Sequence, residues 1–303
     1  MSGAYRLMGI VNVTPDSFSD GGLFLEADAA VAHGLELVAQ GADILDVGGE
    51  STRPGAEPVA EAEELRRVLP VVERLAQARA TSSKVAPGSS AGEHPPFGIS
   101  IDTSKAAVAH AALAAGAGLV NDVTALRGDP EMVAVVAESV ADCCLMHMLG
   151  EPRTMQREPR YRDVVDEVRS FLEERMVFAV GEGIAQERIL LDPGIGFGKT
   201  VEHNLELLRR LGELVALGRP VVIGTSRKSF LGRVDGGQRS RARDDGVLAG
   251  DPSRLPATIA TNVLALERGA SVFRVHDVAP VAAALASAAA TLGATWTASE
   301  ATT

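Results

Sequence analysis

Eight short apolar segments alternate with eight amphipathic segments along this chain of 303 residues, and the alternation restricts the fold more than any other feature. The apolar segments are rich in Val, Ile and Leu, which is typical of strands buried on both faces of a parallel sheet. They cover residues 7–13, 42–48, 98–103, 118–123, 143–148, 188–193, 220–225 and 271–276. Helical periodicity predicts helices over 26–40, 58–78, 104–115, 130–140, 162–181, 201–216, 257–267 and 278–291.

The number and spacing of these segments predict a closed barrel. Eight parallel strands, each followed by a helix, form the (β/α)8 TIM barrel, which takes roughly 250 residues and tolerates insertions. The alternative is an open doubly wound sheet, but no apolar segment leads into a G-x-G-x-x-G turn. We therefore predict an α/β fold, a (β/α)8 TIM barrel, as a single domain over residues 1–303.

Three stretches interrupt or extend this pattern. Residues 79–96 are rich in Ser, Pro and Gly and precede the third predicted strand, on the face of the barrel where strands begin. Residues 235–256 carry mixed charges and glycines and follow the seventh strand, so they lie on the face where strands end. Residues 293–303 are small and polar. We expect flexible inserts at 79–96 and 235–256 and a frayed tail.

The charge and the cysteines limit where the protein acts and what it binds. The formal net charge of −11 argues against general binding to nucleic acid or to a membrane surface, because both need a basic face. Cys143 and Cys144 are adjacent in an apolar run and indicate no disulfide framework. The amino terminus lacks a signal-like apolar stretch, and no apolar run approaches roughly 18 residues. We expect a cytoplasmic protein without nucleic-acid or membrane partners.

Polar residues gather where the predicted strands end. In TIM-barrel enzymes the active site lies at this face, and burying several charges there costs stability unless they meet a ligand or one another. The group comprises Asn12, Glu50, Thr52, Arg53, Asp102, Asn121, Asp122, His147, Asp192, Arg227, Lys228, Arg274 and His276. Taken alone, Asp102 is equally well interpreted as a helix cap. Taken together, the residues predict a pocket.

Four of these residues are suited to an anion. Arg53, Lys228, Arg274 and His276 carry or can carry positive charge. Side chains alternate along a strand, so Arg274 and His276 point to the same side of the last strand. These residues predict an anion site at the mouth of the barrel.

Three other residues have the opposite chemistry. Asp102, Asn121 and Asp192 offer carboxylates and an amide, and a carboxylate accepts two parallel N–H bonds from a guanidine-like group. This set is suited to the edge of a flat heterocycle. The alternation of side chains places only one of Asn121 and Asp122 inside the barrel, and the spacing does not decide which.

The segment LLDPGIGFGKT, residues 190–200, contains Gly-Lys-Thr but lacks the spacing of a Walker loop. That loop requires a glycine five positions before the Gly-Lys-Thr, and Pro193 occupies the position. The three glycines instead allow a tight bend and a close approach of the backbone to a ligand. Phe197 is available either as a lid over a planar ligand or as core filling. No cluster of His and Cys has metal-ligand spacing.

The strand-end motifs, taken in order, resemble those of the dihydropteroate synthase family. They are MGIVNVTPDSFSDGG (8–22), DVGGESTRPG (46–55), SIDT (100–103), VNDV (120–123), GEPRTMQ (150–156), LLDPGIGFGKT (190–200), GTSRKSF (224–230) and FRVHDV (273–278). The resemblance runs from about residue 7 to residue 290. It implies a TIM-barrel transferase of folate biosynthesis that joins 6-hydroxymethyl-7,8-dihydropterin diphosphate to p-aminobenzoate and releases diphosphate.

The resemblance also implies roles for individual residues. The pterin would be bound by Asp102, Asn121, Met146, Asp192 and Lys228. The diphosphate would be bound by Asn12, Thr52, Arg53, Arg274 and His276, with Asn12 also binding Mg²⁺. The p-aminobenzoate would be bound by Phe18, Pro54, Phe197 and Ser229. The catalytic residues would be Asp20, Arg53, Lys228 and Arg274, with Asp20 stabilising the developing cation.

The implied reaction is S_N1-like, because diphosphate leaves before the amine attacks the pterin methylene. A homodimer and competition by sulfonamides at the p-aminobenzoate site are expected from the same resemblance. Two alternatives are a pterin-binding methyltransferase, which has no need of the anion site, and a catalytically inert relative. An inert relative would be expected to have lost Arg53, the DPGIGFGK loop or the SRK motif, and the sequence retains all three.

Overall fold

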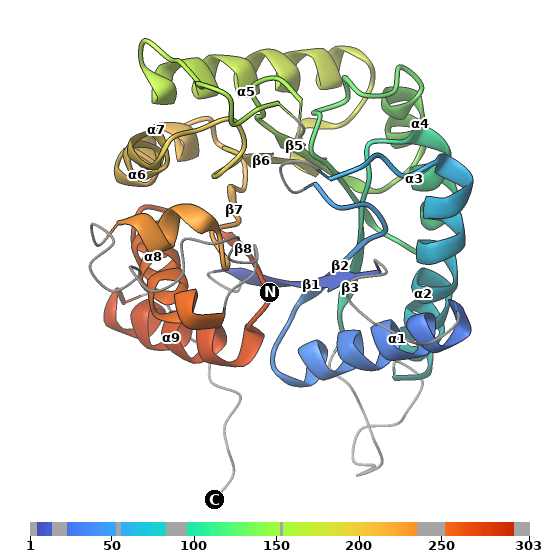
Figure 1. Cartoon of the computed structure of the whole chain (residues 1–303). Coiled ribbons are helices and arrows are strands. Elements are labelled where there is room, and N and C mark those ends of the chain that lie inside the picture. The colour runs from blue at the N-terminus through green and yellow to red at the C-terminus, as the bar shows by residue number, and fades with distance from the viewer. Residues whose placement is uncertain are drawn as a thin grey trace, which may run out of the picture.

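The computed structural model describes residues 5–13, 23–52, 56–82, 96–151, 154–234 and 252–293. Within these ranges, parallel strands form a central ring and helices surround it (Figure 1). The strands are β1 (Arg6–Asn12), β2 (Ile44–Gly48), β3 (Gly98–Asp102), β4 (Leu119–Asp122), β5 (Asp142–Met146), β6 (Ile189–Asp192), β7 (Val222–Ile223) and β8 (Val272–Val275).

Helices follow the strands in the order that the sequence predicts. They are α1 (Leu23–Ala39), α2 (Glu61–Ser82), α3 (Ala106–Ala114), α4 (Met132–Glu138), α5 (Val164–Gly181), α6 (Val201–Arg209), α7 (Gly212–Val215), α8 (Leu255–Glu267) and α9 (Val278–Thr291). Short 3-10 turns cover Gln186–Arg188, Ser229–Arg233 and Pro252–Arg254.

The sheet closes on itself, which confirms the predicted barrel. Its strand order is β6-β5-β4-β3-β2-β1-β8-β7, with parallel pairing between neighbours. A parallel bridge between Leu191 and Val221 then joins the two outer strands, β6 and β7. The amide of Leu191 donates to the carbonyl of Pro220 at 2.9 Å, a distance typical of a hydrogen bond between strands. The open doubly wound sheet is therefore excluded.

Two apolar layers hold the barrel together. The larger one fills the space between the strands and the surrounding helices, and it includes Phe273, Leu45 and Ile99. The smaller one lies inside the barrel and draws one residue from each of seven strands: Met8, Ile44, Leu119, Cys144, Leu190, Val222 and Val272. Because side chains alternate along a strand, residues two positions further along the same strands also face the interior.

The residues two positions beyond the inner apolar layer are mostly polar. They are Ile10, Asp46, Asn121, Met146, Asp192, Gly224 and Arg274. The inner apolar layer therefore forms the floor of the barrel interior, and the charged side chains lie beyond it, toward the carboxyl ends of the strands.

Several predicted boundaries differ from the observed ones. The helix predicted over 201–216 is divided into α6 and α7, because a tight turn in which Glu213 N donates to Arg210 O at 3.0 Å interrupts it. α2 continues to Ser82, so the beginning of the stretch predicted as an insert at 79–96 is helical. At 235–256 the last residues form a 3-10 turn and the start of α8. Residues 83–95, 235–251 and 294–303 lie outside the described residues.

No helix in the described ranges is both long enough and apolar enough to cross a bilayer.

Candidate active site

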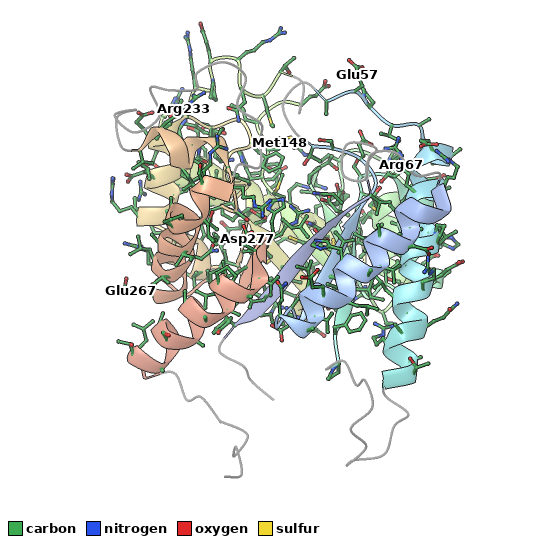
Figure 2. All side chains as sticks on the ribbon, turned by 60° about the horizontal axis from the view of Figure 1, so that its bottom comes forward. Glu57, Arg67, Met148, Arg233, Glu267 and Asp277 are labelled. Carbon is green, nitrogen blue, oxygen red and sulfur yellow. The ribbon has the colours of Figure 1, made fainter. Side chains whose placement is uncertain are left out.

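A cavity of about 760 Å³ opens at the carboxyl ends of the strands. Figure 2 shows Glu57, Met148 and Arg233, which follow β2, β5 and β7, at this end of the barrel. Glu267, at the end of α8, lies toward the opposite end. A cavity of this size accommodates a small organic substrate.

Eight of the predicted site residues line the cavity: Asn12, Thr52, Asp102, Phe197, Lys228, Ser229, Arg274 and His276. They come from β1, β3 and β8 and from the loops after β2, β6 and β7. The sequence therefore identified a set of residues that the fold brings together. The predicted residues Phe18, Asp20, Arg53 and Pro54 lie outside the described residues.

An ion-pair network occupies the deep end of the site. The guanidinium of Arg274 donates from Nε to Asp46 Oδ2 at 2.6 Å and from Nη2 to Asp102 Oδ2 at 2.7 Å. The amide of Asn121 donates to the same Asp46 oxygen at 3.0 Å. Arg274 thus joins β8 to β2 and β3, and Asp46 joins them to β4. The acceptors and the cation that the sequence separated into two groups are in direct contact.

Burial and neighbouring charge act in opposite directions on these groups. Burial raises the pKa of Asp102, although the charge of Arg274 lowers it. Burial works against the charge of Arg274, but Asp46 and Asp102 outweigh it and raise the pKa of Arg274 above that of an ordinary arginine. The guanidinium therefore remains charged and holds the two carboxylates in place.

Asn121, rather than Asp122, faces the interior. Asp122 is on the other face of β4, where its carboxylate accepts from the amides of Thr124 at 2.8 Å and Leu126 at 2.7 Å. Its role is therefore to hold the turn after β4. The alternative interpretation of Asp102 as a helix cap is wrong. The N-cap position of α3 is occupied by Lys105, whose side chain makes no capping hydrogen bond.

Asp192 is buried at the end of β6, where the charges of three cations, Lys228, Arg274 and Lys199, act on it. Burial raises the pKa of Asp192, whereas the charges of Lys228 and Arg274 lower it. Its Oδ1 accepts from the amide of Gly194 at 2.6 Å, so the carboxylate also holds the start of the following loop. Asp192 and Asn121 are not among the residues that line the cavity directly.

Lys228 belongs to the loop after β7, and its side chain contacts the loop after β6. Its ammonium donates to the carbonyl of Ile195 and lies 4.7 Å from the centre of the Phe197 ring. Burial lowers the pKa of Lys228 to about 8, while Asp192 acts in the opposite direction. Lys228 is therefore charged at neutral pH but closer to titration than an ordinary lysine.

Met146 packs beside the site rather than into its lining. It is 3% exposed and forms a small apolar cluster with Val123, Met148 and Met155. Phe197 packs against this cluster and also lines the cavity. The two interpretations of Phe197, lid and core filling, therefore both describe part of its environment.

The loop after β7 is held by contacts with α8 and with the residues that follow β8. Arg227 has φ of +57°, a conformation that costs a non-glycine residue about 1 kcal/mol or more. Its Nε donates to Asp277 Oδ2 at 2.9 Å, and its amide donates to Thr258 Oγ1 of α8 at 3.2 Å. Ser226 Oγ lies 3.0 Å from His276 Nδ1. These contacts fix the backbone of the two residues that precede Lys228.

Two features of the site escaped the sequence reasoning. Asp46 lies in the middle of β2, away from the polar strand ends; its signal is a carboxylate two positions after Ile44 in an apolar strand. Lys199 belongs to the segment 190–200, which lacks the spacing of a phosphate loop. In the structure it is 3% exposed and contacts His147 at 2.9 Å between Nζ and Nδ1.

Two buried polar atoms next to the network lack a protein partner among the described residues. They are Asp46 Oδ1 and Ser100 Oγ, on residues paired in register across β2 and β3. Buried acceptors and hydroxyls are normally hydrogen-bonded. The site therefore has unused hydrogen-bonding capacity deep inside the barrel, which suits a polar ligand.

Comparison with known proteins identifies the family. Residues 8–276 match the family described as pterin binding enzyme. The dihydropteroate synthase of Synechocystis sp. is 43% identical over 277 residues, covering 91% of this chain and 86% of that protein.

Two solved structures are similar over nearly the whole chain. Dihydropteroate synthase from Xanthomonas albilineans in complex with 7,8-dihydropteroate is 43% identical, with a TM-score of 0.77, covering 96% of this chain and 95% of the other. The Yersinia pestis dihydropteroate synthase with a sulfonamide drug complex is 40% identical, with a TM-score of 0.81 and coverage of 96% and 95%. The chain therefore belongs to the pterin-binding enzymes and, among them, to the dihydropteroate synthase family.

Proposed function

We infer that the chain joins 6-hydroxymethyl-7,8-dihydropterin diphosphate to p-aminobenzoate, forming 7,8-dihydropteroate and diphosphate, as a transferase of folate biosynthesis. The observation that carries this inference is the meeting of Asp102, Lys228, Arg274 and His276 in one cavity. A pterin diphosphate needs carboxylates for its ring and cations for its leaving group within reach of each other. The family to which the chain belongs performs this reaction.

The pterin ring would occupy the deep end of the cavity. The guanidinium of Arg274 already donates to Asp102 in a way that a guanidine-like pterin edge would imitate. Asn121, Asp192 and Lys228 would complete the ring's hydrogen bonds. Met146 would act through packing, because its side chain belongs to a small apolar cluster beside the site. Binding of the ring would then require Arg274 to share or release Asp102.

The diphosphate would lie nearer the mouth. Thr52, Arg274 and His276 line the cavity, and Arg53 would join them. Positive charge and hydrogen-bond donors placed where the leaving group gains charge stabilise the transition state. Asp20 would stabilise the cation that remains on the pterin methylene.

Mg²⁺ fits the site as an ion shared with the substrate. Among the described residues, no group of three or more His, Cys, Asp or Glu side chains could hold a metal by itself. Asn12 lines the cavity and offers an amide oxygen, and Mg²⁺ commonly combines one or two protein oxygens with substrate phosphates and water. When bound, the ion would supply positive charge to the departing diphosphate.

The p-aminobenzoate would enter over the loops after β6 and β7. Phe197 and Ser229 line the cavity there, and Phe18 and Pro54 would complete the subsite. A planar aromatic ring packs well against Phe197, and Ser229 offers a hydroxyl for the carboxylate. Sulfonamides, which resemble p-aminobenzoate, would compete at this position.

A diphosphate-release assay with p-aminobenzoate tests the function. We expect release of diphosphate together with formation of 7,8-dihydropteroate. A methyltransferase or an inert relative would release none, and neither alternative is supported by the relatives described above. Absence of both products under conditions where the chain is folded would overturn the inference.

The assignment of Asp192 has its own test. Replacement by alanine (Asp192→Ala) would leave ring donors without a partner, so we expect calorimetry to detect no binding of the pterin diphosphate. By contrast, Arg53→Ala should mainly slow turnover. Normal binding of the pterin diphosphate by Asp192→Ala would show that the residue has another role.

We also propose that the protein works as a cytoplasmic homodimer. Support comes from the family resemblance and from the two free, buried cysteines, which suit a reducing compartment. Sedimentation analysis of the purified protein would measure the mass, and a monomer at micromolar concentration would contradict the proposal.

A further inference from the structure

Lys199 is a buried lysine whose partners are neutral. Its side chain lies in the loop between β6 and α6, and its ammonium contacts His147 Nδ1 at 2.9 Å and the carbonyl of Phe197 at 2.9 Å. No ion pair joins it to a carboxylate within the described part of the chain. Burial lowers the pKa of Lys199 well below the ordinary lysine value, and Asp192 opposes this shift only through its field. The amine donates N–H bonds whether or not it carries the extra proton. Burying a lysine without a carboxylate partner is unfavourable, and the hydrogen bonds that it makes offset part of the cost.

His147 is suited to accept from this ammonium. Burial lowers the pKa of His147 to about 2, and the charge of Lys199 acts in the same direction. The imidazole is therefore neutral, and its Nδ1 has a lone pair for the ammonium. His147 follows β5 directly, and its amide donates to Asp192 O at 2.9 Å, so the acceptor is fixed to the barrel.

The backbone around Phe197 is fixed by several other groups. The amide of Gly196 donates to Asn204 Oδ1 at 2.7 Å, and the amide of Phe197 donates to Gly194 O at 3.0 Å. The hydroxyl of Tyr161 donates to Gly198 O at 2.8 Å. Lys199 supplies the bond to the carbonyl of Phe197 itself. The ring of Phe197 lines the cavity. Because the ring and this carbonyl belong to the same residue, the bond from Lys199 helps to fix the position of the ring.

We propose that Lys199 is a positioning residue that fixes the Phe197 ring as a wall of the p-aminobenzoate subsite, by joining the Phe197 carbonyl to His147 at the end of β5. This proposal rests on the proposed function. Lys199 acts through Phe197 and takes no part in the departure of diphosphate. The pterin-binding carboxylates are held by other contacts, and Lys199 acts on one of them, Asp192, only through its field. The main effect of Lys199 therefore falls on the second substrate.

Steady-state kinetics of Lys199→Met and Lys199→Gln test the proposal. Methionine fills the volume but donates nothing, whereas glutamine is neutral and retains an N–H donor. We expect Lys199→Met to raise the KM for p-aminobenzoate by about ten-fold and to change the KM for the pterin diphosphate by less than about two-fold. Lys199→Gln should recover part of the lost affinity for p-aminobenzoate.

Tyr161→Phe is a milder variant of the same loop and protects the test against misfolding. It removes only the bond to Gly198 O, and it should raise the KM for p-aminobenzoate in the same direction by about two- to three-fold. Equal increases in both KM values, or unchanged KM values with less folded enzyme, would overturn the proposal and leave Lys199 a purely structural role. If the unmodified protein releases no diphosphate, it is the proposed function that fails instead.

Discussion

At the scale of single residues, Asp46 and Lys228 show how burial and charge prepare the site. Asp46 accepts from both Asn121 and Arg274 through one oxygen, so it couples the amide of β4 to the guanidinium of β8. Lys228 has a lowered pKa because burial outweighs the attraction of Asp192. Both residues hold charge in a place where a ligand can use it, and both make testable predictions.

Removal of Asp46 should destabilise the protein strongly. Asp46→Ala leaves Arg274 with one buried carboxylate instead of two, and breaking a buried ion pair costs about 3 kcal/mol. We expect urea denaturation to show a loss of that size in the free energy of unfolding. Asp28→Ala is the matched control, because Asp28 is 57% exposed in its ion pair with Arg74 and should cost less than about 1 kcal/mol. Equal losses in the two variants would refute the structural role of Asp46.

The titration of Lys228 should weaken pterin diphosphate binding at alkaline pH. The lysine is charged below its pKa of about 8 and neutral above it. A charge-assisted hydrogen bond is stronger than a neutral one, so we expect the affinity to fall on the order of ten-fold between about pH 7 and pH 9.5. Calorimetry across this range measures the fall. Lys228→Arg retains its charge throughout, so the fall in affinity due to this residue should be absent from the variant.

The lowered pKa of Lys228 affects the free energy of unfolding in the opposite direction to its effect on ligand affinity. The pKa of Lys228 is lower in the folded state than the ordinary lysine value of 10.5. Between about pH 8 and pH 10.5 the unfolded chain binds more protons at this residue, so its contribution to the free energy of unfolding rises with pH. Ligand affinity and stability should therefore change in opposite directions over this range, and the stability difference between the unmodified protein and Lys228→Met should show it.

At the scale of elements, the loop between β6 and α6 depends on glycines that no other residue can replace. Gly194 has φ of +64°, and a Cβ there would lie 1.8 Å from the carbonyl oxygen of His147. Gly198 also has positive φ, and a Cβ would lie 2.7 Å from the side chain of Leu149. The loop therefore packs its backbone against the end of β5, which places Phe197 and Lys199 at the cavity.

Two alanine substitutions should separate the cost of backbone strain at positive φ from the cost of a steric clash of the added methyl group. Gly218 also has positive φ, at +76°, but a Cβ there meets nothing within 4 Å. Gly218→Ala should cost about 1 kcal/mol through backbone strain alone. Gly194→Ala adds a collision with backbone and should cost about 3 kcal/mol or more. Urea denaturation measures both, and similar losses would show that the loop moves easily to admit the methyl group.

At the scale of the whole molecule, the barrel has one weak seam. β7 has only two residues, and a single bridge joins it to β6. The side chain of Arg219 adds a bond from Nε to Ile189 O at 3.1 Å across the same seam. On the other side, β1 pairs with β2 over five residues. The loop that carries Lys228 and Ser229 thus follows the strand with the least support from its neighbours.

Hydrogen exchange should reveal this difference along the barrel. Amides in elements with fewer partners open at lower free energy than those in the central ladder. We expect the amides of Val222 and Ile223 to exchange faster than those of Leu45 and Val47, as mass spectrometry of peptic peptides or NMR would measure. Equal protection in β7 and β2 would show that the barrel opens only as a unit.

The sequence alone predicted much of the fold, because each of its eight strand and helix segments is indicated by the pattern of neighbouring residues. Strand segments of Val, Ile and Leu and helices with apolar faces follow from neighbouring residues, and the helix predicted over 278–291 agrees with α9 (Val278–Thr291). The break at Arg210 and the extension of α2 to Ser82 could not be predicted in this way. Besides the local turn, Arg210 donates to Asp163 Oδ2 at 2.7 Å, and near the end of α2 Arg79 donates to Gly116 O at 3.0 Å. Both partners are distant in the chain.

The sequence by itself determined that polar residues gather at the ends of the strands, because the order of the strands and the position of their ends follow from local pattern. Eight of the residues predicted in this way line one cavity. Only the tertiary structure decided their partners: closure of the barrel brings Arg274 against Asp46 and Asp102, which are 228 and 172 residues away. It also decided that Asn121 and not Asp122 faces the interior, and that Lys199 meets His147. Such contacts depend on register and shear around the whole ring, and no local pattern contains them.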